Sequence, residues 1–222
     1  MEKILKSLKS INRDTDKLID FLKEKDFFEK PASINHHSNY SGGLAYHSQL
    51  VYEKFKALNE EFNAEIPEDT LIVSSILHDL CKIDDYSKEG SPPSKKQKKF
   101  LRHLIVNNGI DLSDVGELNK NKTSQLIDWL KNTPNEPMPD LKDEWGYNNS
   151  PEIPLKHAEK SIFYANRYID LKERETLAIR YHMGAWENNL DKKNYNEAAT
   201  KFPDIKLLAI ADEKATFQEK WE

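Results

Sequence analysis

Residues 71–83 read LIVSSILHDLCKI and are apolar at most positions. We predict a helix here, opened by Pro67, because proline suits a first turn and the acidic residues that follow suit the helix dipole. A helix that is apolar around its whole circumference is buried in a core. His78 and Asp79 are therefore expected inside a buried helix, where an unpaired charge is very unfavourable and needs a partner.

Other ionisable side chains fall on the apolar faces of predicted helices. His47 and Asp212 do so clearly, and His157 and His182 lie in two further predicted helices. A single histidine on such a face is most often a core residue with its hydrogen bonds satisfied. Several ionisable groups from separate helices instead favour a shared cation, and imidazole nitrogen with carboxylate oxygen suits Mn, Fe, Co, Ni or Zn better than Ca.

The remaining pattern predicts an all-α helical bundle of roughly seven to nine helices. Apolar residues recur at helical spacing, no stretch alternates convincingly as a strand, and glycine is scarce at 7 residues. The helices are predicted at 3–24 (broken near Asn12), 44–58, 67–83, 95–108, 113–131, 155–170, 172–185 and 205–216. We expect a single domain spanning 1–222, with a polar helical and Pro-rich insertion at about 91–154.

Composition excludes several classes of function. With a formal net charge of −5, the chain lacks the positive electrostatic field of a dedicated nucleic-acid binder, so no stable duplex binding is expected. The lysines at 95, 96, 98 and 99 form either a solvated helix face or a rim that attracts anions. One cysteine, Cys81, and the lack of a signal peptide or long apolar run predict a cytoplasmic protein without membrane contact. The oligomeric state is left open.

Four ordered segments resemble the HD-domain superfamily over roughly residues 31–217. Residues 35–37 (NHH) and 42–47 (GGLAYH) are similar to the first-ligand segment of HD domains in bacterial 3′-to-5′ exoribonucleases. Residues 76–82 (ILHDLCK) match the His-Asp doublet with its following lysine, and residues 208–212 (LAIAD) match the closing aspartate. An isolated HD dipeptide would mean nothing, but the ordered set with its apolar context is specific.

The resemblance implies a metal site. In the family pattern His47, His78, Asp79 and Asp212 bind one divalent transition-metal ion. His157 and His182 fill the places of two further histidines that bind a second ion in many members, with Asp79 bridging the two. The alternatives to a second metal site are that His157 faces solvent at the start of a helix and that His182 is a core residue with satisfied hydrogen bonds.

The same resemblance makes Asp79 and Lys82 the expected catalytic residues. Lys82 follows Asp79 by three positions, so it lies near the same helical face. A lysine facing the pocket there would hold a phosphate oxygen. The alternative is a lysine that extends to solvent from a helix end.

Candidate substrate-binding residues come from nearby loops and helices. His36 and His37 line the pocket mouth or form a surface pair. Trp145 and Tyr147, in the Pro-rich loop, stack a nucleobase or anchor the loop. Arg180 is a candidate phosphate clamp, although it points away from His182 on an ideal helix.

The expected function is a metal-dependent phosphohydrolase. It would cleave a phosphoester bond in a small phosphorylated substrate, a nucleotide or short oligonucleotide, by attack of metal-activated water, with two ions of Mn, Fe, Co, Ni or Zn. One alternative is a mixed-valent di-iron oxygenase of the same ligand order. Another is a non-catalytic nucleotide-binding module, which the full ligand set disfavours.

Overall fold

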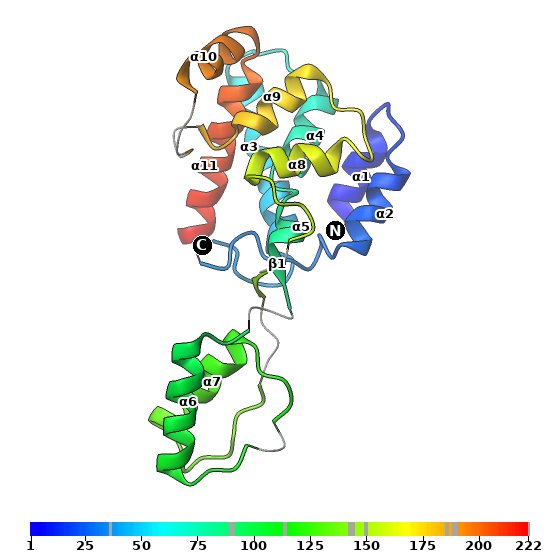
Figure 1. Ribbon diagram of the computed structural model, residues 1–222. Helices are drawn as coiled ribbons and strands as arrows, with labels where there is room; N and C mark the ends of the chain where they lie inside the picture. Colours follow the sequence, from blue (N-terminus) through cyan, green and yellow to red (C-terminus); the bar gives the residue numbers. More distant parts are fainter. Residues whose placement is uncertain are drawn as a thin grey trace. The chain divides into compact units, whose positions relative to one another are not determined.

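The computed structural model describes residues 1–35, 37–88, 92–112, 115–141, 145–148, 151–184, 187 and 191–221. The all-helical class is confirmed: helices account for nearly all regular structure of the described residues (Figure 1). The chain divides into two compact units, Met1–Ile83 with Ile153–Glu222, and Asp84–Glu152. The insertion expected at about 91–154 overlaps the second unit.

The first unit carries the predicted metal ligands. Its helices are α1 (Glu2–Ser10), α2 (Asp16–Glu24), α3 (Gly43–Glu61), α4 (Glu68–Leu77), α8 (His157–Ala165), α9 (Glu173–Tyr181), α10 (Lys192–Lys201) and α11 (Asp204–Trp221), and the short α5 (Lys82–Asp85) follows α4. α3 packs against α4 and α11, while α9 packs against α4, α8 and α11 (Figure 1). Two apolar clusters result. Along α3 one cluster ends with Ala45 and the other begins with Leu50, so His47 lies at their junction.

The His78-Asp79 doublet lies just after a helix, which corrects the continuous helix predicted over 67–83. α4 ends at Leu77. The backbone hydrogen bonds that follow span three residues instead of four. They run from the Leu80 N–H to the Leu77 carbonyl and from the Lys82 N–H to the Asp79 carbonyl. The Cys81 N–H donates instead to Ser161 Oγ of α8, at 3.0 Å. The Ser161 hydroxyl of α8 thus accepts from a backbone N–H that would donate to the Leu77 carbonyl if α4 continued.

Two glycines hold the 31–41 loop against the start of α3. Gly42 has φ +87°, a left-handed conformation that favours glycine. A Cβ on Gly43 would lie 2.0 Å from the Ser38 carbonyl oxygen, so no larger residue fits without moving the loop. The close approach places His37 beside α3.

A buried ion pair anchors the start of α9. The guanidinium of Arg13, between α1 and α2, donates two hydrogen bonds of 2.8 Å to Glu175, whose side chain is fully buried. Thr70 at the start of α4 donates a third to the same carboxylate. Because the charge is paired and hydrogen-bonded, its burial is tolerated, and α9 is fixed at the end opposite His182.

The second unit has its own small core. It contains β1 (Tyr86–Ser87), α6 (Lys95–Asn108), α7 (Lys120–Asn132) and β2 (Gly146–Tyr147), with Leu101, Leu126 and Leu130 buried together. The helix predicted at 113–131 begins later, at Lys120, because the Asn119 side chain accepts from the Lys122 N–H and caps it. The paired two-residue strands were not predicted.

The described residues form eleven helices rather than the predicted seven to nine. The break near Asn12 is confirmed, since α1 ends at Ser10 and α2 begins at Asp16. The extra elements are α5, split from α4, and α10, which buries only Ala199 and so shows little apolar pattern. Within the described part of the chain, none of the helices is long and apolar enough to cross a membrane.

Candidate metal centre

The first unit brings all six predicted metal ligands together. They come from five places in the fold: the second turn of α3, the turn after α4, which supplies both His78 and Asp79, the start of α8, the residue after α9 and the middle of α11. The ligands lie in two groups, His47, His78 and Asp212 on one side and His157 and His182 on the other, with Asp79 between them.

We call the first group the His47 half. His47 Nε2 lies 3.1 Å from Asp212 Oδ1, and His78 Nε2 lies 3.9 Å from the same oxygen. Both imidazoles are buried, and neither Nε2 atom has a hydrogen-bond partner among the described residues. A buried polar atom without a partner is costly, and a cation among these three donor atoms would satisfy both nitrogens.

We call the second group, His157 and His182 together with Asp79 Oδ1, the His157 half. His157 Nε2 lies 2.7 Å and His182 Nε2 3.7 Å from Asp79 Oδ1. The two Nε2 atoms are 3.1 Å apart. The other carboxylate oxygen, Asp79 Oδ2, lies 3.9 Å from His78 Nε2. Asp79 therefore offers one oxygen to each half, as a carboxylate shared by two ions would.

Two of the four histidines are fixed by backbone. His78 caps the C-terminus of α4 and His182 that of α9, and each places Nδ1 2.7 Å from the carbonyl three residues earlier, Ser75 and Ile179 respectively. A carbonyl only accepts, so Nδ1 carries the proton and Nε2 keeps a lone pair directed into the site. Such outer hydrogen bonds set the tautomer of metal-binding histidines.

The other two histidines are held by side chains. His47 Nδ1 lies 3.2 Å from Glu219 Oε2, and His157 Nδ1 lies 3.0 Å from Cys81 Sγ. The sulfur sits behind the imidazole, at the nitrogen that does not face Asp79. All four rings therefore present Nε2 to the site.

The electrostatics distinguish these two pairs of histidines. Burial lowers the pKa of His78, and it lowers that of His182 to about 3, so both are neutral donors. Burial also opposes charge on His47, but the carboxylates of Asp212 and Glu219 outweigh it and raise the pKa to about 10. For His157, burial is likewise outweighed, by Cys81 and Asp79, and the pKa rises.

Lys82 contributes charge at the doublet. Burial raises the pKa of Asp79, but Lys82 is the strongest of the opposing influences, ahead of His157 and His78, and the pKa falls well below its usual range. Asp79 is thus ionised. The pocket-facing orientation of Lys82 stays a prediction.

The predicted substrate-binding residues are only partly near the site. His37 lies beside His47, with ring centroids 4.8 Å apart. Arg180 is occupied by carboxylates, with Glu187 at 2.9 Å and Glu159 at 3.4 Å, which weakens its interpretation as a phosphate clamp.

The other three predicted substrate-binding residues, His36, Trp145 and Tyr147, are not placed beside the proposed ligands. His36 lies outside the described residues. Trp145 and Tyr147 belong to the second unit, where the Lys88 ammonium lies 4.9 Å from the Trp145 ring centroid and Tyr147 lies beside Tyr86.

Two residues around the site were missed by the sequence reasoning. Glu219 lies seven residues after Asp212 in α11, a spacing that places both on the same helical face. That spacing was the available signal. Cys81 was noted only as a lone cysteine, and nothing local indicates that it would contact His157, 76 residues away.

Comparison with known proteins gives distant relatives. A 3′-5′ exoribonuclease YhaM from Geobacillus sp. is 33% identical over 97 residues, 44% of this chain and 28% of that protein. A dihydroneopterin 2′,3′-cyclic phosphate phosphodiesterase from Methanocaldococcus jannaschii is 29% identical over 125 residues, 48% of this chain and 50% of that protein. YhaM of Bacillus subtilis is 29% identical over 83 residues, 37% of this chain and 26% of that protein.

The chain spans half or less of the length of each of these relatives. No family model matches it, and no solved structure matches it.

Proposed function

Because the chain is a distant homologue within the HD-domain superfamily, we propose that it is a metal-dependent phosphohydrolase that cleaves a phosphoester bond in a nucleotide or short oligonucleotide. The proposed ligands are His47, His78 and Asp212 for one divalent transition-metal ion and His157 and His182 for a second, with Asp79 shared. Both kinds of relative are named for cleaving phosphoester bonds, in RNA or in a cyclic phosphate.

The observation that carries the proposal is the convergence of four imidazole Nε2 atoms on the carboxylates of Asp79 and Asp212. Among the described residues, His47 Nε2 and His78 Nε2 have no hydrogen-bond partner, and His157 Nε2 lies 3.1 Å from His182 Nε2. The lowered pKa values of His78 and His182 keep these two imidazoles neutral, so their Nε2 lone pairs are available to a cation. Divalent cations would bind these nitrogens in both halves, and the mixed nitrogen and oxygen donors suit Mn, Fe, Co, Ni or Zn.

The surrounding residues have separate roles in this proposal. Bound divalent cations would activate a water molecule and offset charge on the phosphoryl oxygens. Asp79 remains ionised, so it serves as a shared ligand and hydrogen-bond acceptor. The Lys82 ammonium binds a phosphoryl oxygen and stabilises the charge that grows on it in the transition state. The tautomers of His78 and His182 are fixed before substrate arrives.

Substrate contacts by His36, His37, Trp145, Tyr147 and Arg180 stay predictions. The formal net charge of −5 favours a small substrate over a long nucleic acid, since a long polyanion would be repelled.

The test is hydrolysis by protein stripped of metal and reloaded with Mn without O₂. The panel contains mononucleotides, nucleoside 2′,3′-cyclic phosphates and short oligonucleotides. Asp79→Ala, prepared identically, is the control for contaminating phosphatases. We expect phosphate, nucleoside or nucleotide release by the wild type only.

Two results would contradict this function. One is a full panel without product from metal-loaded protein. The other is iron-specific O₂ uptake on addition of a small polyol or phosphonate, which would establish the oxygenase alternative, because oxygenation needs a metal that changes valence whereas hydrolysis does not.

A further inference from the structure

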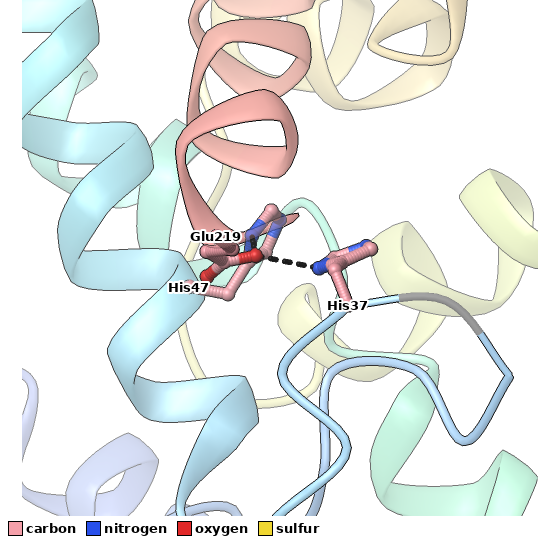
Figure 2. Close-up of side chains that lie close together, drawn as sticks. All are labelled: His37, His47 and Glu219. Atoms are coloured by element: carbon pink, nitrogen blue, oxygen red, sulfur yellow. Dashed lines mark hydrogen bonds and ion pairs between the residues drawn. The ribbon is translucent and has the colours of Figure 1, made fainter. Parts of the chain in front are cut away.

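We propose that Glu219 is a positioning residue that holds His47 with Nε2 directed at the metal and Nδ1 protonated. The inference rests on the proposed metal site and adds a residue outside the family resemblance, which ends near residue 217. Figure 2 shows the arrangement: Glu219 comes from the end of α11, His47 from α3 and His37 from the loop before α3.

One oxygen of the Glu219 carboxylate lies within hydrogen-bond distance of two imidazoles. Glu219 Oε2 lies 2.6 Å from His37 Nδ1 and 3.2 Å from His47 Nδ1 (Figure 2). A carboxylate only accepts, so His47 donates Nδ1–H, and its Nε2 lone pair faces Asp212 and His78. A histidine backed by a carboxylate is a more basic and better oriented ligand.

Burying an ionised carboxylate is unfavourable unless hydrogen-bond donors compensate for the lost water. The Glu219 side chain is 2% exposed, and in the described part of the chain its second oxygen, Oε1, has no hydrogen-bond partner. His37 and His47 hold its pKa down, at about 2, against the effect of burial. An ionised carboxylate is thus kept behind a ligand histidine, with His37, fixed by the Gly42-Gly43 turn, as its second donor.

The group of His37, His47 and Glu219 is not itself a third metal site. An imidazole that binds a cation through Nε2 retains its proton on Nδ1 at ordinary pH. His47 therefore cannot also ligate through Nδ1, and only His37 and Glu219 would remain, too few protein ligands for a tight site.

α11 consequently contacts both ring nitrogens of His47. Asp212 supplies a ligand, and Glu219, two turns later, orients the imidazole that lies between them. We therefore expect the last turns of α11 to set metal affinity in the His47 half and to leave the His157 half unchanged.

The experiment compares Glu219→Ala, Glu219→Gln and the control Glu213→Gln, an exposed position of the same helix. Affinity for Zn is measured by competition with a chromophoric chelator, and the ¹⁵N spectrum of the histidine rings is recorded on the Zn-loaded protein. We expect about 10- to 100-fold weaker binding of one ion in Glu219→Ala, a smaller loss in Glu219→Gln, which keeps one acceptor, and none in the control. The His47 Nδ1 proton should exchange faster in Glu219→Ala.

The outcomes separate this inference from the proposed function. Wild type that binds no metal would overturn both. Wild type that binds two ions, with unchanged affinities and an unchanged His47 signal in Glu219→Gln and Glu219→Ala, would overturn the role of Glu219 alone. Loss of one ion from three, the other two unaffected, would show that Glu219 is a ligand. Glu219→Gln is nearly isosteric, so it tests the inference even if Glu219→Ala fails to fold.

Discussion

The two halves of the candidate metal centre use the same kinds of donor atom but differ in charge and exposure. In the His47 half both imidazoles are buried, and His47 lies between two carboxylates, Asp212 and Glu219. In the His157 half, the His157 side chain is 29% exposed, and among the described residues Asp79 is the one carboxylate within hydrogen-bond distance of it. Because Asp212 is an anionic ligand that the His157 half lacks, the His47 half should bind the tighter ion. We expect substrate and solvent to enter at the more open His157 half.

Replacing the residue that both halves share should have the largest effect. Asp79→Ala removes one oxygen from each group and leaves four imidazoles facing one another. We expect loss of both ions and of hydrolysis, measured by metal analysis of protein purified without a metal-affinity tag and by turnover. A variant with the metal content and turnover of wild type would remove Asp79 from the site.

Replacing a ligand of one half should separate the two ions. His182→Ala should retain one tightly bound ion, in the His47 half. Asp212→Ala should lose that ion and retain only the more weakly bound ion of the His157 half. Stepwise Mn titration followed by electron paramagnetic resonance distinguishes these cases. Equal losses in the two variants would mean that the halves do not bind independently.

Lys82 tests the role of charge on the open side. Lys82→Met keeps the length of the side chain and removes the ammonium. We expect both ions to remain and kcat to fall about 100-fold or more, as when one electrostatic contact to the transition state is removed. Lys9→Met, at an exposed position of α1, is the matched control. Unchanged kcat and KM in Lys82→Met would return Lys82 to the helix-end alternative.

The raised pKa of His47 gives the metal site a pH dependence. Without metal, His47 is protonated up to about pH 10, against an ordinary value of 6.5. Its interaction with the two carboxylates therefore stabilises metal-free protein fully below pH 6.5 and is lost as the pH rises through about 10. Because metal must displace this proton, affinity in the His47 half should rise up to about tenfold per pH unit between these values.

Calorimetry in buffers of different ionisation enthalpy would measure the released proton. Binding without proton release at pH 7.5 would contradict the assignment of His47 as a ligand. In Glu219→Gln the proton should leave more easily, since one of the two charges that retain it is gone.

Local pattern was sufficient to predict the apolar helices and the residues on their buried faces. The stripe at 44–58 and the seam around Asp212 predicted α3 and α11, and the helix at 95–108 has the predicted bounds. The end of α4 at Leu77 depends on a hydrogen bond from Cys81 to Ser161, 80 residues away. A pattern within one segment contains no information about such a contact.

The six proposed ligands were predicted from the sequence as residue types in order, and the structure brings them together, but their outer contacts were not predictable. The contacts of His47 with Glu219 and of His157 with Cys81 join distant segments of the chain. The carbonyl contacts of His78 and His182 follow only from the helix ends, which the sequence placed beyond these residues.

A crystal structure of protein saturated with Mn, with anomalous scattering recorded at the metal edge, tests the central claim most directly. Two peaks about 3.5–4 Å apart are expected, as in two-metal phosphoester hydrolases, one on each side of Asp79. The peak among His47, His78 and Asp212 should have the higher occupancy at limiting Mn. Absence of any peak at Asp79, or a single peak with His157 and His182 unligated at saturation, would contradict the account.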